Sequence, residues 1–134
     1  MITKIYNLKK NQTDQKILQR ARVQNKIEEL SAEILMTQTK LETTSVDKFG
    51  AISDFAILQI HKNTMKAHIG KLNMVKNRLE QEVEKIDEEI KELLKETEQF
   101  KYLVEEEKKE AFKKLLKKEE EFTEEYVQSK YIAS

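Results

Sequence analysis

The sequence predicts an all-α fold, a two-helix antiparallel coiled-coil hairpin whose C-terminal helix is the longer one. Three observations lead to this prediction. An apolar seven-residue repeat runs through the second half of the chain. The 134 residues include no proline and only two glycines, which leaves few residues suited to tight turns. Charged residues make up 37% and hydrophobic residues 38% of the chain, which suits helices buried along single stripes rather than a thick core.

The second helix is expected over residues 54–130, a length of about 115 Å at ~1.5 Å per residue. Alternating steps of three and four residues keep its apolar side chains on one stripe, as in a helix that packs along another helix. Lys76 and Thr97 are polar exceptions; they either fix the register or, for the lysine, bury only the stem. The apolar seam consists of Ile69, Leu72, Leu79, Val83, Ile86, Ile90, Leu93, Phe100 and Val104.

The first helix is expected over residues 3–44. Its seam is clear from Val23 to Leu41 and blurred over the polar stretch 9–16. A separate small apolar stripe at the start consists of Ile2, Ile5 and Leu8.

The turn between the two helices is expected over residues 45–53. Thr43 to Asp47 are β-branched or backbone-competing residues that disfavour a helix interior. Gly50 can take the left-handed backbone angles that end a helix. Ser53 and Asp54 then offer an N-cap hydroxyl and a first-turn carboxylate to the second helix.

The charge pattern favours pairing of the two helices within one chain. Residues 1–26 contain seven basic residues and one acid, a net charge of +6, whereas residues 80–98 contain nine acids and three lysines, a net charge of −6. A reversal near residue 50 sets these blocks side by side, at positions whose numbers sum to about 99. A parallel dimer would place like charge on like charge. We therefore expect an intramolecular hairpin that is monomeric alone.

The length difference leaves residues 99–134 without an internal partner. This segment, roughly 50 Å long at ~1.5 Å per residue, carries several large apolar side chains. After Val104 its stripe requires one extra four-residue step near Lys108, a stutter that changes the packing of a coiled coil. An apolar surface of this size indicates a binding partner.

The composition offers little for enzymatic chemistry. Net charge is zero, which does not favour nucleic acid, and the longest apolar run has four residues, so we expect a cytoplasmic chain without membrane insertion. His61 and His68 have lysine neighbours rather than further metal ligands. Gly70-Lys71 lacks the rest of a phosphate-binding loop. The glutamate runs are typical of solvated helix faces, and we expect no enzymatic activity, cofactor or metal.

An apolar cluster surrounds the expected turn. It is larger than two seam positions can bury, so it either caps the hairpin core or docks another protein at the tip. The cluster comprises Phe49, Ile52, Phe55, Ala56, Ile57, Leu58 and Ile60.

The C-terminal segment also carries a family resemblance. It reads Glu105-Glu106-Glu107-Lys108-Lys109, then Leu115-Leu116-Lys117-Lys118-Glu119-Glu120-Glu121, then Glu124-Glu125-Tyr126. With this ending, its size and a reversal near Gly50, the chain resembles, over essentially its whole length, the FliJ/YscO family of small stalk proteins of flagellar and injectisome type III export.

The resemblance implies a non-enzymatic stalk or adaptor of the flagellar protein export apparatus, located in the cytoplasm at the membrane-associated machinery. In that family the paired helix termini sit inside the hexameric export ATPase ring, the hairpin tip reaches the membrane export gate, and export chaperones are handed over. Transferred here, the gate contacts are Phe49, Ile52, Phe55 and Leu58. The ATPase contacts are Ile2, Ile5, Leu8, Phe112, Leu115, Phe122 and Tyr126.

Two other functions remain open from the sequence. One is a type III secretion chaperone whose helices bind a client in a groove. The other is a homodimeric coiled-coil scaffold in which the C-terminal overhangs of two copies pair.

Overall fold

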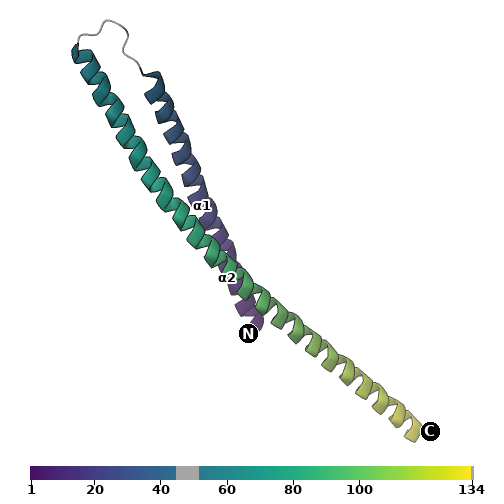
Figure 1. Cartoon of the computed structure of the whole chain (residues 1–134). Helices are drawn as coiled ribbons and strands as arrows, with labels where there is room; N and C mark the ends of the chain where they lie inside the picture. The colour runs from purple at the N-terminus through teal and green to yellow at the C-terminus, as the bar shows by residue number, and fades with distance from the viewer. Residues whose placement is uncertain (45–51, 134) are drawn as a thin grey trace. The chain divides into compact units, whose positions relative to one another are not determined.

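The structure, a computed structural model, describes residues 1–44 and 52–133 and contains two long α-helices. Helix α1 spans Ile2–Thr43 and helix α2 spans Ile52–Ala133 (Figure 1). The two helices pack against each other, and the described residues include no strand. The prediction of an all-α coiled-coil hairpin with a longer second helix is confirmed.

The helix ends lie close to the expected positions. Helix α2 begins at Ile52, so Ser53 lies within its first turn instead of preceding it, and Asp54 is in that first turn. Most of the predicted turn 45–53, including Gly50, falls on residues 45–51, which lie outside the described residues.

Threonines near the end of α1 satisfy their hydroxyls within the helix. The Oγ1 atoms of Thr37, Thr39 and Thr43 donate to the carbonyl oxygens four residues earlier, at 2.8–2.9 Å. The backbone N–H of Thr44 donates to the carbonyl of Lys40 at 2.9 Å. This internal bonding explains why α1 tolerates threonines that otherwise compete with helix formation.

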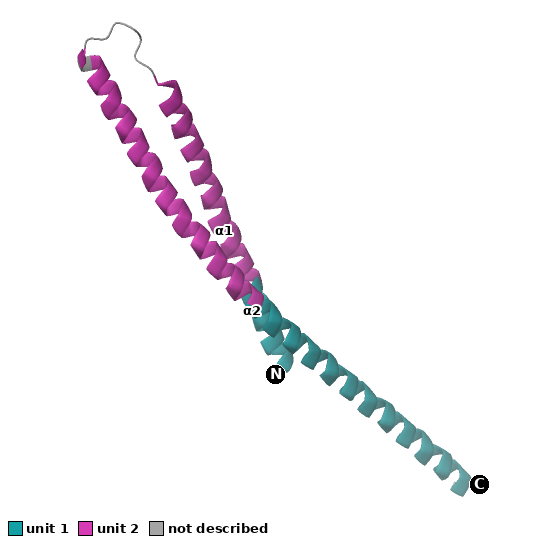
Figure 2. Ribbon diagram, in the orientation of Figure 1, with its two compact units in different colours: residues 1–13, 92–134 teal, residues 14–91 magenta. Residues whose placement is uncertain are grey.

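The described chain falls into two compact units (Figure 2). Unit 1 contains residues 1–13 and 92–134, and unit 2 contains residues 14–91. In unit 2, the α1 and α2 segments lie side by side and run in opposite directions (Figure 2). The buried apolar side chains of unit 2 are Ile27, Leu30, Ile34, Met65, Val83 and Ile86.

The burial pattern of α2 follows the seven-residue repeat. Every seam position from Ile69 to Val104 is buried or half-buried, including the polar exceptions Lys76 and Thr97. The residues between them are mostly exposed. Spacing by three and four therefore selects the face that packs on α1, regardless of whether the residue is apolar.

The seam of α1 continues through the stretch that looks blurred in the sequence. Buried or half-buried positions recur in steps of three and four along the whole helix. Long side chains fill the polar positions because their stems can pack while their charged ends reach the rim. Between residues 2 and 23 the positions that follow this spacing are Ile2, Tyr6, Lys9, Thr13, Lys16, Arg20 and Val23, and Ile5 is half-buried next to them.

The pairing register differs from the expected sum of 99. That sum would place Lys16 beside Val83, whereas Lys16 Nζ lies 2.5 Å from Glu89 Oε2. It would also place Thr13 beside Ile86, but Thr13 lies beside Thr97. The Lys16 and Glu89 side chains are long and reach along the seam, which accounts for part of the difference at Lys16. In unit 1 this change of register lets α1 cover α2 beyond residue 98.

Candidate partner-binding surfaces

The strongest candidate surface is the C-terminal part of α2 in unit 1. Phe100 is half-buried, Val104 is buried and Glu106 is half-buried, so the covered part extends further than the expected end at residue 98. From residue 107 to residue 132 every side chain is exposed. We call residues 107–132 the overhang.

Large apolar side chains line one side of the overhang. Helical spacing of three, four and seven residues places Phe112, Leu115, Phe122 and Tyr126 on a common stripe. Their exposed fractions range from 55% for Leu115 to 71% for Phe122. Further exposed apolar side chains near the stripe or the end of the helix are Leu116, Val127, Tyr131 and Ile132. A surface of this kind marks an interaction site.

Side-chain interactions within the helix accompany this surface. Glu106 Oε1 lies 3.7 Å from Lys109 Nζ, an ion pair one turn apart. Lys130 Nζ lies 5.9 Å from the centroid of the Tyr126 ring, within cation–π range. Contacts of this type contribute little each, so a partner would add most of the stabilisation of the overhang.

The N-terminal stripe named from the sequence does not form one surface. Ile2 and Ile5 are half-buried in unit 1, whereas Leu8 is exposed. The seam instead passes through Tyr6 and Lys9. Leu8 is therefore the most accessible of the three residues expected to meet a partner beside the overhang.

A layer of polar residues, made by Lys9, Thr13, Glu96 and Thr97, lies in the seam of unit 1. Lys9 Nζ lies 2.8 Å from Glu96 Oε2. Thr13 is only 4% exposed, and its Oγ1 donates to the carbonyl of Lys9 at 2.8 Å. Thr97 Oγ1 donates to the carbonyl of Leu93 at 2.6 Å. The Lys9 ammonium and the Glu96 carboxylate thus form an ion pair, and each threonine hydroxyl bonds to the backbone of its own helix.

Ion pairs also border the seam in unit 2. Arg20 Nε lies 2.5 Å from Asp87 Oδ1, and Lys16 pairs with Glu89. Hydrogen bonding and charge from Lys16, with a smaller charge effect of Lys85, lower the pKa of Glu89, while partial desolvation acts in the opposite direction. The Glu89 Oε2 atom is enclosed, and the Lys16 ammonium is the cation in contact with it.

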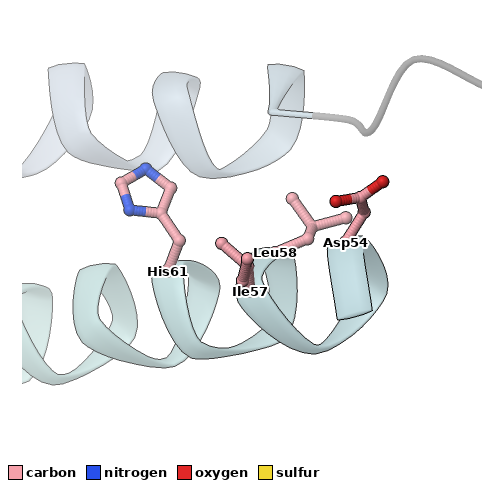
Figure 3. A pocket seen from close by; sticks show the side chains of 4 residues that line it. All are labelled: Asp54, Ile57, Leu58 and His61. Carbon is pink, nitrogen blue, oxygen red and sulfur yellow. The ribbon is translucent and has the colours of Figure 1, made fainter. Parts of the chain in front are cut away.

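The second candidate surface lies at the start of α2 in unit 2. Ile52, Phe55, Ile57 and Ile60 are exposed and Leu58 is half-buried, while Phe49 lies outside the described residues. Leu58 and His61 project toward the facing turn of α1 and line a shallow pocket with Asp54 and Ile57 (Figure 3). Most of the cluster therefore faces outward instead of capping the core.

His68 contacts a carboxylate of the other helix. His68 Nε2 lies 3.3 Å from Glu33 Oε1, and both histidines border a depression between α1 and α2 with Met36, Lys40 and Met65. In residues 1–44 and 52–133, no cluster of three or more His, Cys, Asp or Glu side chains could hold a metal ion.

One surface depression was missed by sequence reasoning. Exposed Tyr102 and Leu103 line it on unit 1 together with Lys95, Glu98 and Gln99. These residues lie off the seam. The sequence signal for the depression is the pair Tyr102 and Leu103, two large apolar residues at positions that do not belong to the repeat. The depression is open and has no buried polar group that would select a ligand.

Comparison with known proteins identifies the family. Searches of curated proteins and of solved structures gave no match. Of the two described helices, neither is long and apolar enough to cross a membrane. The model of the flagellar FliJ protein family matches residues 2–134, nearly the whole chain. The chain therefore belongs to the flagellar FliJ family, a family of non-enzymatic stalk proteins of flagellar type III export.

Proposed function

We propose that this chain acts as the stalk of the export apparatus by inserting its overhang into the hexameric export ATPase ring. The observation that carries the proposal is the uncovered run from residue 107 to residue 132, with its apolar stripe. A stripe that the chain leaves uncovered is available to a ring of subunits surrounding the helix. Leu8, also exposed in unit 1, is the α1 residue best able to join this contact.

The start of α2 is the proposed contact with the membrane export gate. Ile52 and Phe55 are exposed there, and Leu58 is half-buried beside His61. Aromatic and branched apolar side chains gathered on one helix end suit the apolar centre of a protein interface. Handover of export chaperones by the same chain is part of this proposal and would use one of these two surfaces.

The ring contact is tested by measuring ATP hydrolysis by the export ATPase with and without the purified chain. We expect the wild-type chain to stimulate hydrolysis and the Phe122→Ala/Tyr126→Ala variant to lose most of this stimulation. Removing two large apolar side chains from an interface centre typically costs tenfold or more in affinity. Circular dichroism should show nearly unchanged helicity, since both residues are exposed.

The matched control is Leu35→Ala/Met74→Ala. These two residues are 64% and 67% exposed, close to Tyr126 and Phe122, but lie in unit 2. The control variant should stimulate hydrolysis as the wild type does. Full stimulation by the Phe122→Ala/Tyr126→Ala variant would refute the ring contact, whereas equal losses in both variants would show a general loss of structure.

A further inference from the structure

The charges of the overhang are divided into two blocks of opposite sign. Residues 108–118 contain six lysines and one glutamate, a net charge of +5. Residues 119–125 contain five glutamates and no basic residue, a net charge of −5. The change of sign falls between Lys118 and Glu119, near the middle of the exposed segment.

The apolar stripe has a matching arrangement about the same point. Phe112 and Leu115 precede the change of sign, and Phe122 and Tyr126 follow it. All four are exposed in the structure. Each half of the overhang therefore offers two large apolar side chains flanked by charge of one sign.

We infer that the overhangs of two copies of this chain pair in antiparallel orientation through this stripe. A two-fold axis near residue 118 would bring Phe112 and Leu115 of one copy beside Phe122 and Tyr126 of the other. The basic block of each copy then runs beside the acidic block of its partner. Such an interface is isologous, because the same patch serves both copies.

The orientation follows from the charges. In a parallel pair, each block would lie beside an identical block. In the antiparallel pair, each block lies beside the block of opposite sign, and only the two Glu119 side chains meet near the two-fold axis. Like-charge contacts are strongly disfavoured at interfaces, so the antiparallel pair is selected.

The length of the overhang is adequate for this pairing. The stripe from Phe112 to Tyr126 spans about two heptads and lies wholly within the 26 exposed residues, so it can pair along its full length. The hairpin needs no second copy, since α1 and α2 already cover each other's seams. The pair uses the stripe of the overhang, which is separate from that seam but is also the stripe proposed for the ring contact. A dimer contrasts with the monomer expected from the sequence.

Sedimentation equilibrium of the full chain tests the inference without any other protein. We expect the mass to rise from monomer toward dimer over the micromolar to millimolar range. High salt should weaken the pair, because exposed charges are screened. A monomer throughout this range would overturn the inference, and it would leave the proposed ring contact standing.

Charge reversal provides the specific test. The Lys114→Glu/Lys118→Glu and Glu121→Lys/Glu125→Lys variants should each associate at least tenfold more weakly than the wild type. An equimolar mixture of the two should recover association, because opposite charges again face each other. The Lys66→Glu/Lys71→Glu control changes two exposed lysines of unit 2 and should behave as wild type. Wild-type association by both overhang variants would refute the pairing.

Spin labels determine the orientation. The chain contains no cysteine, so a single introduced cysteine labels one site. Labels on Lys118→Cys, a position that flanks the stripe next to the two-fold axis, should lie close together across the pair. Labels on Lys109→Cys should lie about 28 Å apart along the axis in an antiparallel pair, at ~1.5 Å per residue. Short distances at both sites would indicate a parallel pair and overturn the inference.

Discussion

Thr13 and Thr97 face each other in the seam of unit 1, with their Oγ1 atoms 3.4 Å apart. Each hydroxyl has one proton, and each lies within hydrogen-bonding distance of the carbonyl four residues earlier in its own helix. One threonine can donate to the other only by giving up that carbonyl. The pair is thus a polar layer that tolerates burial without strongly joining the two helices.

Replacing this layer with valine should stabilise the chain. The Thr13→Val/Thr97→Val variant removes both hydroxyls and buries two more methyl groups, with an expected gain of about 0.5–1.5 kcal/mol in the free energy of unfolding. Urea unfolding followed by circular dichroism measures this gain. A lower urea midpoint would show that the threonine contact holds the helices together more strongly than its geometry implies.

The ion pair between Arg20 and Asp87 should contribute modestly. Both side chains are more than one third exposed, so solvent and salt screen the pair despite the short contact. A double-mutant cycle of Arg20→Ala and Asp87→Ala should give a coupling energy of about 0.2–1 kcal/mol at low salt and less at high salt. A coupling energy that does not change with salt would contradict this account.

The Lys16–Glu89 ion pair should make stability depend on pH. Because the pKa of Glu89 is lowered in the folded chain, the unfolded chain binds more protons in the acidic range. The stabilisation is present above the unfolded pKa and is lost as pH falls through the folded pKa. The Glu89→Gln variant should therefore show a flatter fall in urea midpoint on acidification than the wild type. Glu119→Gln, in the overhang, serves as the comparison variant, and identical slopes for all three chains would refute the role of Glu89.

Gly70 lies within α2 in an exposed position where an added Cβ would meet nothing within 4 Å. The Gly70→Ala variant should raise the free energy of unfolding by about 0.5–1 kcal/mol, since alanine loses less backbone entropy in a helix. Thermal unfolding measures the effect. A destabilised variant would mean that another protein or helix segment approaches this backbone closely.

The sequence predicts the helical architecture well because burial follows spacing. Val83, Ile86 and Val104 are buried where the repeat places them. In the first helix, Leu8 of the separate apolar stripe is exposed, whereas Thr13, in the polar stretch where the seam looked blurred, is buried. Spacing alone would have found Thr13, because it continues the steps of three and four.

The pairing register and the extent of the overhang were harder to predict. Both depend on which residues of one helix lie opposite which residues of the other. A seven-residue repeat presents an equivalent set of residues every seven positions, so it is compatible with several registers. Charge blocks limit this choice only coarsely, since ion pairs such as Lys9–Glu96 connect positions that are not directly opposite. Phe122 and Tyr126, which are proposed to bind a partner, are predictable as apolar positions, but the repeat alone does not say which molecule covers them.

The exposed run from residue 107 to residue 132 also bears on turnover of the protein. A solvent-exposed helix opens often, and each opening offers proteases an extended segment with aromatic cleavage sites. Binding of another molecule to the overhang keeps the helix closed and protects it from proteases. Abundance of the chain in the cell would then follow the supply of its binding partners, with surplus copies degraded from the C-terminal end.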